Sequence, residues 1–196
     1  MSKEKILVTG SKGQLGNELR KISNQYDTFE FLFFDVDELD ICNPSQIETR
    51  IPKEISIIIN CAAYTAVDKA ETEETIARKI NVDGPRFLAE FAKRNSIHLI
   101  HISTDYVFDG KSYIPYREDD ATNPVSVYGK SKLEGEQAVK QSNCSATVIR
   151  TSWLYSSFGN NFVKTILRFA KERDELGIVF DQIGTPTYAG DRKSVV

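Results

Sequence analysis

Short apolar runs alternate along this chain with segments in which apolar residues recur at helical spacing, and this alternation limits the fold more than any other feature. Runs without polar alternation are typical of strands that helices cover on both faces. The pattern therefore predicts an α/β fold built on a doubly wound parallel sheet. The expected strands are 5–10, 30–35, 55–60, 97–103, 146–153 and 176–180.

Helices are expected between these strands, and one of them should be interrupted. Gly84-Pro85 lies in the middle of the longest helical pattern and predicts a kink, because proline cannot donate a backbone hydrogen bond. Asn43 offers an N-cap to the shortest, with Pro44 at its first position. The predicted helices are 14–23, a short one from 43, 72–95, 125–141 and 160–172.

Composition places the chain among ordinary globular proteins and excludes little beyond that. Its 196 residues carry 25 Lys and Arg against 28 Asp and Glu, so the net charge of -3 gives no reason to expect nucleic acid or an anionic membrane as a partner. Cys42, Cys61 and Cys144 are widely spaced, which favours reduced thiols over a disulfide framework or a metal site. We expect a cytoplasmic protein without a targeting segment. Whether it forms a homodimer is left open.

The stretch TGSKGQLG places Gly10, Gly13 and Gly16 between the first predicted strand and the first predicted helix. In such a turn glycine allows positive φ and a close approach of pyrophosphate, and the helix N-terminus attracts phosphate charge. The alternative is a tight turn that binds nothing. Because a strand precedes the motif and a helix follows it, we expect a Rossmann-like dinucleotide site.

Residues after the second strand bear on which dinucleotide would bind. Asp35 lies where a carboxylate accepts hydrogen bonds from the adenosine ribose, which favours NAD. Lys12, inside the glycine turn, is placed to meet the 2′-phosphate of NADP instead. Asp40 and Ile41 lie where an adenine would rest. The sequence leaves the choice between NADH and NADPH open.

Tyr128 lies four residues before Lys132, a spacing that puts both side chains on one face of a helix. An exposed helix face is the simplest explanation of such a pair. However, the segment follows a loop, 105–124, that begins where a strand ends at Thr104, and loops of this length are usually functional. We expect the lysine, together with an oxidised nicotinamide, to lower the pKa of the phenol, so that Tyr128 exchanges a proton with an oxygen that Thr104 positions.

Several longer segments, in this order along the chain, resemble the extended short-chain dehydrogenase/reductases and, among them, the dTDP-4-dehydrorhamnose reductases. The resemblance runs from about Lys5 to Gly190, and these blocks together are more specific than the glycine turn or the tyrosine-lysine pair. The matching segments are AAYTAVDKAE, STDYVFDG, VYGKSKLEGE, RTSWLY, GNNFVKTIL and DQIGTPTYA.

The resemblance implies roles for residues at matching positions. Tyr128 would be the proton donor, and Lys132 and Thr104 would complete the catalytic set. Tyr128 and Lys132 would also contact the cofactor. Thr104, Asp105 and Trp153 would contact the sugar nucleotide. Besides Gly10 and Gly16 of the turn, the family's cofactor-contacting positions are Gly13, Gln14, Leu15, Asp35, Asp40, Ile41, Ala63, Tyr64, Thr65 and Ile102.

Some of these residues also have purely structural explanations. Asp105 is placed to cap the turn after its strand, and Trp153 is placed to join the core. Asn81 is placed either to bend its helix and hold a water, as in related reductases, or only to accompany the kink. His98 and His101 lie three apart on a strand and face opposite sides, so we expect structural roles for both. In some relatives glutamates such as the one matching Glu18 bind Mg²⁺ between subunits, but no metal site is predicted here.

The function implied is transfer of a hydride from NADPH or NADH to the 4-keto group of a dTDP-linked deoxyhexulose, giving dTDP-L-rhamnose. A sugar-nucleotide dehydratase or epimerase is less favoured, because dehydratases carry Asp-Glu after the strand-end threonine and here Tyr106 follows Asp105. A third alternative is a non-catalytic dinucleotide-binding subunit like the regulatory partner of methionine adenosyltransferase.

We expect the chain to contain a whole dinucleotide-binding domain but only the beginning of a substrate domain. Residues 1–150 are expected to form the dinucleotide-binding domain, and 151–196 the end of that domain and the start of a substrate domain. Relatives continue well beyond Val196, and the tail RKSVV departs from their pattern. From this resemblance we expect most of the small substrate domain to be missing, sugar-nucleotide binding to be weak or absent, and the chain to be weakly active or inactive.

Overall fold

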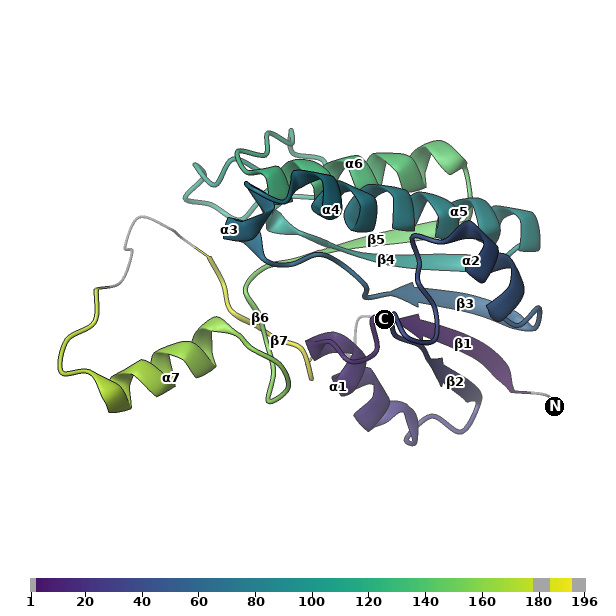
Figure 1. Ribbon diagram of the computed structural model, residues 1–196, viewed down its shortest axis with the longest axis horizontal. Coiled ribbons are helices and arrows are strands. Elements are labelled where there is room, and N and C mark those ends of the chain that lie inside the picture. Colours follow the sequence, from purple (N-terminus) through teal and green to yellow (C-terminus); the bar gives the residue numbers. More distant parts are fainter. Residues whose placement is uncertain (1–2, 178–183, 192–196) are drawn as a thin grey trace.

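The computed structural model describes residues 3–177 and 184–191 of the 196-residue chain (Figure 1). Its helices are α1 (Gln14–Ser23), α2 (Pro44–Arg50), α3 (Val67–Ala70), α4 (Glu74–Arg78), α5 (Gly84–Asn95), α6 (Val127–Ser142) and α7 (Phe162–Glu172), with a π-helical turn at Lys79–Asp83 and a 3-10 turn at Asp105–Val107. Its strands are β1 (Glu4–Thr9), β2 (Phe29–Phe33), β3 (Ile55–Asn60), β4 (His98–Thr104), β5 (Ala146–Thr151), β6 (Leu154–Tyr155) and β7 (Thr187–Tyr188).

A five-stranded parallel sheet in the order β2-β1-β3-β4-β5 forms the centre of the molecule. Five of the six predicted strands are confirmed. The sixth, 176–180, lies partly outside the described residues. Because the strands are parallel, their carboxyl ends meet at one edge, where such folds bind ligands.

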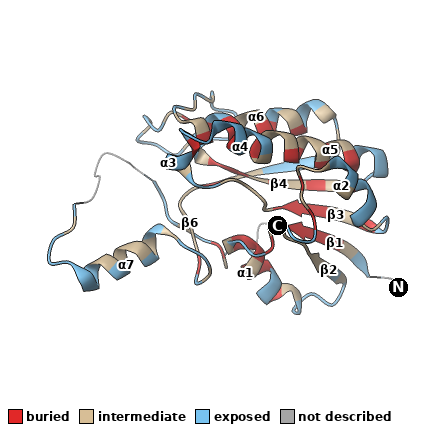
Figure 2. Cartoon of the chain, viewed as in Figure 1, coloured by how far each residue is buried: buried red, intermediate tan, exposed pale blue. Residues whose placement is uncertain are grey.

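Helices cover both faces of the sheet, as the apolar strand pattern predicts (Figure 2). On one face Leu7, Ile58 and Leu99 are fully buried beneath α2, α5 and α6. On the other, the apolar side of α1 packs against β1 and β3 through Leu15 and Leu19. The doubly wound α/β class is therefore correct.

The long helix predicted over 72–95 is interrupted where the sequence indicates, but by a π-helical turn and not by a proline kink. A π-helical turn, Lys79–Asp83, separates α4 from α5, and Pro85 falls in the first turn of α5, where it needs no backbone donor. The predicted N-cap is confirmed, since the Asn43 side chain accepts hydrogen bonds from the backbone amides of Ser45 and Gln46.

The segment from β6 onward leaves the sheet as an arm whose helix, α7, extends away from the body (Figure 1). All 11 residues of α7 are described and none of them is buried. The short strands β6 and β7 pair in parallel, and Ala189 beside β7 is buried against the α1 face of the sheet.

No helix among residues 3–177 and 184–191 has the length and apolar character needed to cross a membrane.

Candidate active site

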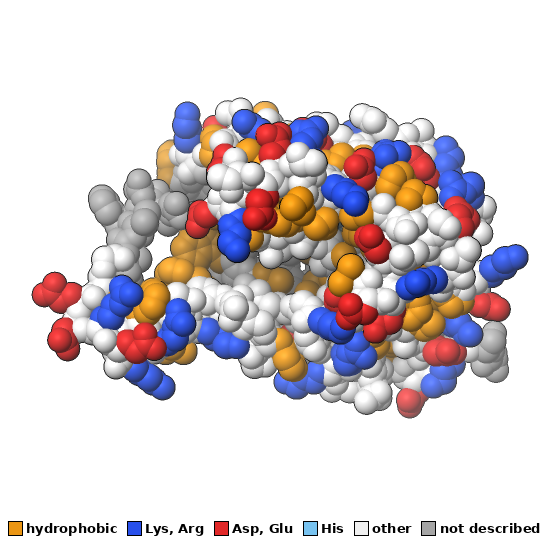
Figure 3. All heavy atoms as spheres, in the orientation of Figure 1, with side chains coloured by type: hydrophobic (Ala, Val, Ile, Leu, Met, Phe, Trp, Pro, Cys, Tyr) orange, Lys and Arg blue, Asp and Glu red, His pale blue; other side chains and the backbone are white. Residues whose placement is uncertain are grey.

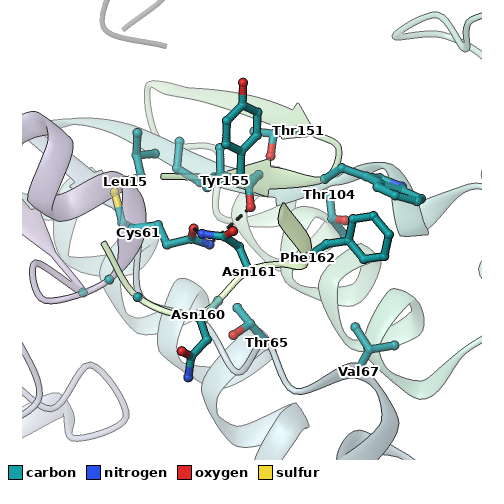
Figure 4. Close-up of a pocket in the computed structure, with 18 of the residues that line it drawn as sticks. Leu15, Cys61, Thr65, Val67, Thr104, Thr151, Tyr155, Asn160, Asn161 and Phe162 are labelled. Atoms are coloured by element: carbon teal, nitrogen blue, oxygen red, sulfur yellow. Dashed lines mark hydrogen bonds between the residues drawn. The ribbon is translucent and has the colours of Figure 1, made fainter. Parts of the chain in front are cut away.

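A cavity of about 1230 Å³ follows the carboxyl edge of the sheet. The space-filling view shows the surface hollowed between the body and α7, with hydrophobic side chains in the hollow (Figure 3). The close-up shows side chains from the glycine turn, the strand ends and the arm around one space, among them Leu15, Cys61, Thr104, Asn161 and Phe162 (Figure 4). The cavity thus joins both parts of the molecule.

The glycine turn forms one end of this cavity, and its backbone could not carry side chains at two positions. Gly10 has φ +61°, and an added Cβ would lie 2.6 Å from the Ala62 nitrogen. A Cβ at Gly16 would lie 2.6 Å from the Ser11 Cα. Gly13 caps α1 without a side-chain hydrogen bond, which leaves amide groups of the first turn directed toward the cavity end.

A charged cluster lies beside the turn at the end of β2. The Asp35 carboxylate accepts hydrogen bonds from the backbone amides of Lys12 at 2.8 Å and of Val36 at 2.9 Å. The Lys12 ammonium pairs with Asp37 at 2.5 Å, and this pairing raises its pKa. Asp35 and Lys12, the two residues that bear on the choice of dinucleotide, are therefore tied together.

Asp40 and Ile41 also line the cavity, although both have structural partners. The Asp40 carboxylate accepts a hydrogen bond from the Cys42 amide at 2.8 Å. Ile41 is a core residue, and a Cβ at Gly84 would come within 2.6 Å of its side chain. The wall expected to hold an adenine is thus held by contacts within the protein.

Ala63 and Thr65 line the cavity, whereas the side chain of Tyr64 points elsewhere. The Tyr64 hydroxyl donates to Glu73 at 2.5 Å. The backbone of Tyr64 is fixed by Asn81, which accepts from its amide at 2.9 Å and donates to its carbonyl at 3.1 Å. Asn81 therefore links the π-helical turn to the cavity wall, and a Tyr64 contact with a cofactor would have to be made by its backbone.

The structure brings Tyr128, Lys132 and Thr104 together, as their positions predict. All three line the cavity and are buried, with exposed fractions of 9%, 2% and 6%. The Lys132 ammonium donates to the Ile102 carbonyl at 2.8 Å, which fixes the lysine on β4 next to Thr104. An exposed helix face is excluded for the pair.

The expectation that Lys132 lowers the pKa of Tyr128 is wrong for this structure. Burial raises the pKa of Tyr128 to about 12, because the phenolate would lose its hydration, and the hydroxyl of Thr104 only partly opposes this. Burial lowers the pKa of Lys132 to about 8, against the attraction of Glu136. At neutral pH the tyrosine is therefore protonated and the lysine charged, a pair suited to donating a proton.

Asp105 and Trp153 lie at the far end of the same cavity. Burial raises the pKa of Asp105, and its carboxylate accepts a hydrogen bond from Thr104 at 3.2 Å. Trp153 has φ +46°, an uncommon conformation for a bulky residue, and packs edge-on against Phe162 with ring centroids 5.2 Å apart. A simple core role for Trp153 does not account for this backbone.

The arm contributes residues that the site prediction omits. Asn161 caps α7 by accepting from the Lys164 amide, and its side-chain nitrogen donates to Gln14 at 2.9 Å. Asn160 and Phe162 also line the cavity. An asparagine directly before a helical pattern is an N-cap signal, but its direction toward the glycine turn depends on the fold.

His98 and His101 contact different neighbours and do not share a site. His98 bonds to the hydroxyls of Ser145 and Thr147, and buried His101 contacts Asn60. Among the described residues no group of three or more His, Cys, Asp or Glu is placed to hold a metal ion.

The cavity fits a dinucleotide by the shape of its own residues. At one end lie the glycine turn, whose close packing leaves no room for a Cβ, the N-terminus of α1 and the Asp35 carboxylate. The protonated phenol of Tyr128 lies toward the other end. Such an arrangement can hold a pyrophosphate and give a proton to an oxygen bound beside Tyr128.

Comparisons with known proteins agree with this geometry. The family model described as RmlD substrate binding domain matches residues 4–196. The dTDP-4-dehydrorhamnose reductase of Aggregatibacter actinomycetemcomitans is 48% identical over 193 residues, which cover 98% of this chain and 66% of that protein. That of Sinorhizobium fredii is 46% identical, covering 95% of this chain and 63% of that protein.

Solved structures give the same result. The crystal structure of dTDP-4-dehydrorhamnose reductase from Bacillus anthracis in complex with NADP matches with a TM-score of 0.94 and 44% identity, covering 99% of this chain and 69% of that one. With 66% and 63% coverage, the chain spans slightly less than two thirds of the length of the two curated relatives from Aggregatibacter actinomycetemcomitans and Sinorhizobium fredii.

Proposed function

The chain belongs to the RmlD substrate binding domain family, that of the dTDP-4-dehydrorhamnose reductases, and on this premise we propose that it takes part in NAD(P)H-dependent reduction of a dTDP-linked 4-keto-6-deoxyhexose. The substrate would be dTDP-4-dehydro-L-rhamnose and the product dTDP-L-rhamnose. A bound nicotinamide dinucleotide would supply the hydride.

Tyr128 is the proton donor in this proposal. Its buried phenol keeps its proton at neutral pH, as a reductase requires of the group that protonates the developing alkoxide. Lys132, charged and fixed on the Ile102 carbonyl, stabilises the phenolate left behind. Thr104 directs its hydroxyl at the same position and orients the substrate oxygen.

The dinucleotide would lie with its pyrophosphate on the glycine turn and α1. Gly10 and Gly16 allow the approach, Asp35 faces the adenosine ribose, and Ile102 borders the nicotinamide. A 2′-phosphate is compatible with Lys12 only if the Lys12–Asp37 pair opens. The further residues assigned to cofactor binding are Gly13, Gln14, Leu15, Asp40, Ile41, Ala63, Tyr64 through its backbone, and Thr65.

The sugar nucleotide would occupy the end of the cavity bordered by Asp105, Trp153 and the arm. Residues 1–150 then act as the dinucleotide-binding domain, and the segment from 151 begins the part that binds substrate. The strained backbone of Trp153 supports this division, because strain of this kind is concentrated at functional sites.

The observation that carries the proposal is the buried Tyr128–Lys132 pair beside Thr104 in a cavity that also holds the glycine turn. To test it, the purified chain is mixed with NADPH, and separately with NADH, and the nicotinamide absorbance is followed after addition of dTDP-4-dehydro-L-rhamnose. Loss of absorbance only when the sugar nucleotide is present supports the reductase.

Two other outcomes would contradict it. Binding of both the dinucleotide and the sugar nucleotide, measured by protein fluorescence, without any loss of absorbance would favour a regulatory subunit. Formation of a dehydrated sugar nucleotide without net oxidation of the dinucleotide, detected by mass spectrometry, would favour a dehydratase.

A further inference from the structure

Glu136 continues the face of α6 that carries the proposed proton donor and its lysine. It lies four residues after Lys132 and eight after Tyr128, and its exposed fraction is 8%. A carboxylate removed from water is costly unless it is paired and hydrogen-bonded. The proposed chemistry does not use Glu136, so its burial at this position needs another explanation.

Two neighbouring strands bind the Glu136 carboxylate. Ser103 donates to its Oε1 at 2.5 Å, and Arg150 donates through Nε to Oε1 at 3.0 Å and through Nη2 to Oε2 at 2.7 Å. Ser103 and Arg150 are register partners on β4 and β5. Because Ser103 directly precedes Thr104, this contact holds α6 at a fixed position relative to the catalytic end of β4.

The same carboxylate pairs with one cation and lies on the same helix face as a second. Arg150 pairs with it directly, with the guanidinium partly exposed, while Lys132 is buried one helical turn away. Glu136 and Cys61 favour the charged form of the lysine, and burial opposes it. The titratable or charged groups around Lys132 and its tyrosine are Cys61, His101, Asp105, Tyr106 and Glu136, and Arg150 lies against Glu136.

We propose that Glu136 is a positioning residue of the active site, whose carboxylate, held by Ser103 and Arg150, fixes α6 on β4 and keeps the Lys132 ammonium charged beside the Ile102 carbonyl. The inference rests on the proposed function, because it assigns Glu136 a part in the same proton transfer. Arg150 carries a positive charge against the same carboxylate, so it should act on the lysine in the opposite direction.

A structural ion pair and a positioning residue differ in what they do to Lys132. If the Glu136–Arg150 pair only stabilises the fold, replacing either partner would lower the free energy of unfolding and would not shift the pKa of Lys132 in a consistent direction. A residue that controls the charge of Lys132 must move its pKa, and removing Glu136 and removing Arg150 must move it in opposite directions.

The test measures the pKa of Lys132 by NMR of the chain with 13C-labelled lysine, with the Lys132→Arg variant identifying the signal. Glu136→Gln should lower this pKa by about one pH unit, and Arg150→Gln should raise it. Glu134→Gln makes the same chemical change two residues away, where Glu134 pairs with Arg78, and should leave the signal unmoved.

The proposal is overturned if the pKa of Lys132 is the same in Glu136→Gln as in the control variant Glu134→Gln. If Glu136→Gln does not fold, Arg150→Gln decides, and an unchanged or lowered pKa overturns the proposal. None of these measurements needs turnover. A chain that does not oxidise NADPH but shows the two opposite shifts would contradict the proposed function while supporting the assignment of Glu136.

Discussion

The body of the molecule and its arm border the same cavity, yet they are held in place in different ways. In the body, residues 4–151, side chains such as Leu7, Leu88 and Leu99 are completely buried between sheet and helices. In α7 no residue is buried, and Leu167 is 59% exposed. The arm meets α1 through polar contacts, among them Ser156 with Glu18, and through Leu154 and Ala189, which pack on the α1 side of the sheet.

This difference separates chemistry from substrate binding. Tyr128, Lys132 and Thr104 all belong to the body, so burial on folding fixes their geometry. Phe162 and Asn161 belong to the part of the arm around α7, a helix with no buried residue. Changes in the body should therefore affect catalysis and stability, and changes in the arm should affect affinity for the sugar nucleotide.

The largest expected effect separates Tyr128→Phe from Phe162→Ala. Removing the phenolic hydroxyl takes away the proposed proton donor, so kcat should fall by about 10²–10⁴-fold while dinucleotide affinity is kept. Phe162→Ala should raise the KM for the sugar nucleotide with little change in kcat. Steady-state kinetics measures both, and an equal loss of kcat in the two variants would remove the distinction.

Two leucine substitutions compare the packing of the two regions. Leu88→Ala leaves a cavity in the core and should lower the free energy of unfolding by about 2–5 kcal/mol. Leu167→Ala, on the exposed helix, should change it by less than about 0.5 kcal/mol. Urea denaturation gives both values. A large effect of Leu167→Ala would mean that α7 is packed in solution.

Two glycines with the same backbone conformation allow a matched comparison. Gly10 and Gly159 both have φ +61°, so alanine should cost about 1 kcal/mol at either. At Gly10 the new Cβ would also meet the Ala62 backbone at 2.6 Å, and this crowding should add about 1–3 kcal/mol. At Gly159 it meets only the Gln14 side chain, at 3.2 Å. Equal losses in thermal unfolding would show that the turn can relax.

The smallest effect is a pH dependence confined to the body. Because the pKa of Lys132 is lowered from 10.5 to about 8, the unfolded chain binds a proton between these values that the folded chain has released. The contribution to stability therefore rises with pH through this window and is lost as pH falls toward 8. Between pH 8 and 9 the wild type should gain about 1 kcal/mol relative to Lys132→Met. If the free energy of unfolding changes with pH in the same way in the wild type and in Lys132→Met, the lowered pKa of Lys132 is contradicted.

Local sequence rules were sufficient where a feature depends on neighbours along the chain. The apolar runs predicted five strands of the sheet, Asn43 predicted a cap, and the spacing of Tyr128 and Lys132 placed both on one helix face. Gly10 was identified because its conformation, after a strand and before a helix, excludes a side chain. Each is decided within a few residues.

Features that depend on distant segments were missed or reversed. The direction of the Tyr128 pKa shift was predicted wrongly, because a lysine four residues away was weighed without the desolvation that the surrounding core imposes. The Tyr64 side chain turned toward Glu73, away from the cavity. The π-helical turn before Gly84 and the contact of Asn161 with Gln14 could not be derived from spacing.

By itself the sequence determined the order of elements, the glycine turn and the helical pairing of Tyr128 with Lys132, because hydrogen-bond geometry and side-chain period act over short stretches. Only the tertiary structure decided that this pair is buried beside Thr104, that Glu136 is bound by two strands, and that the arm closes one end of the cavity. Burial and electrostatic potential are sums over atoms that the fold brings together from distant parts of the chain.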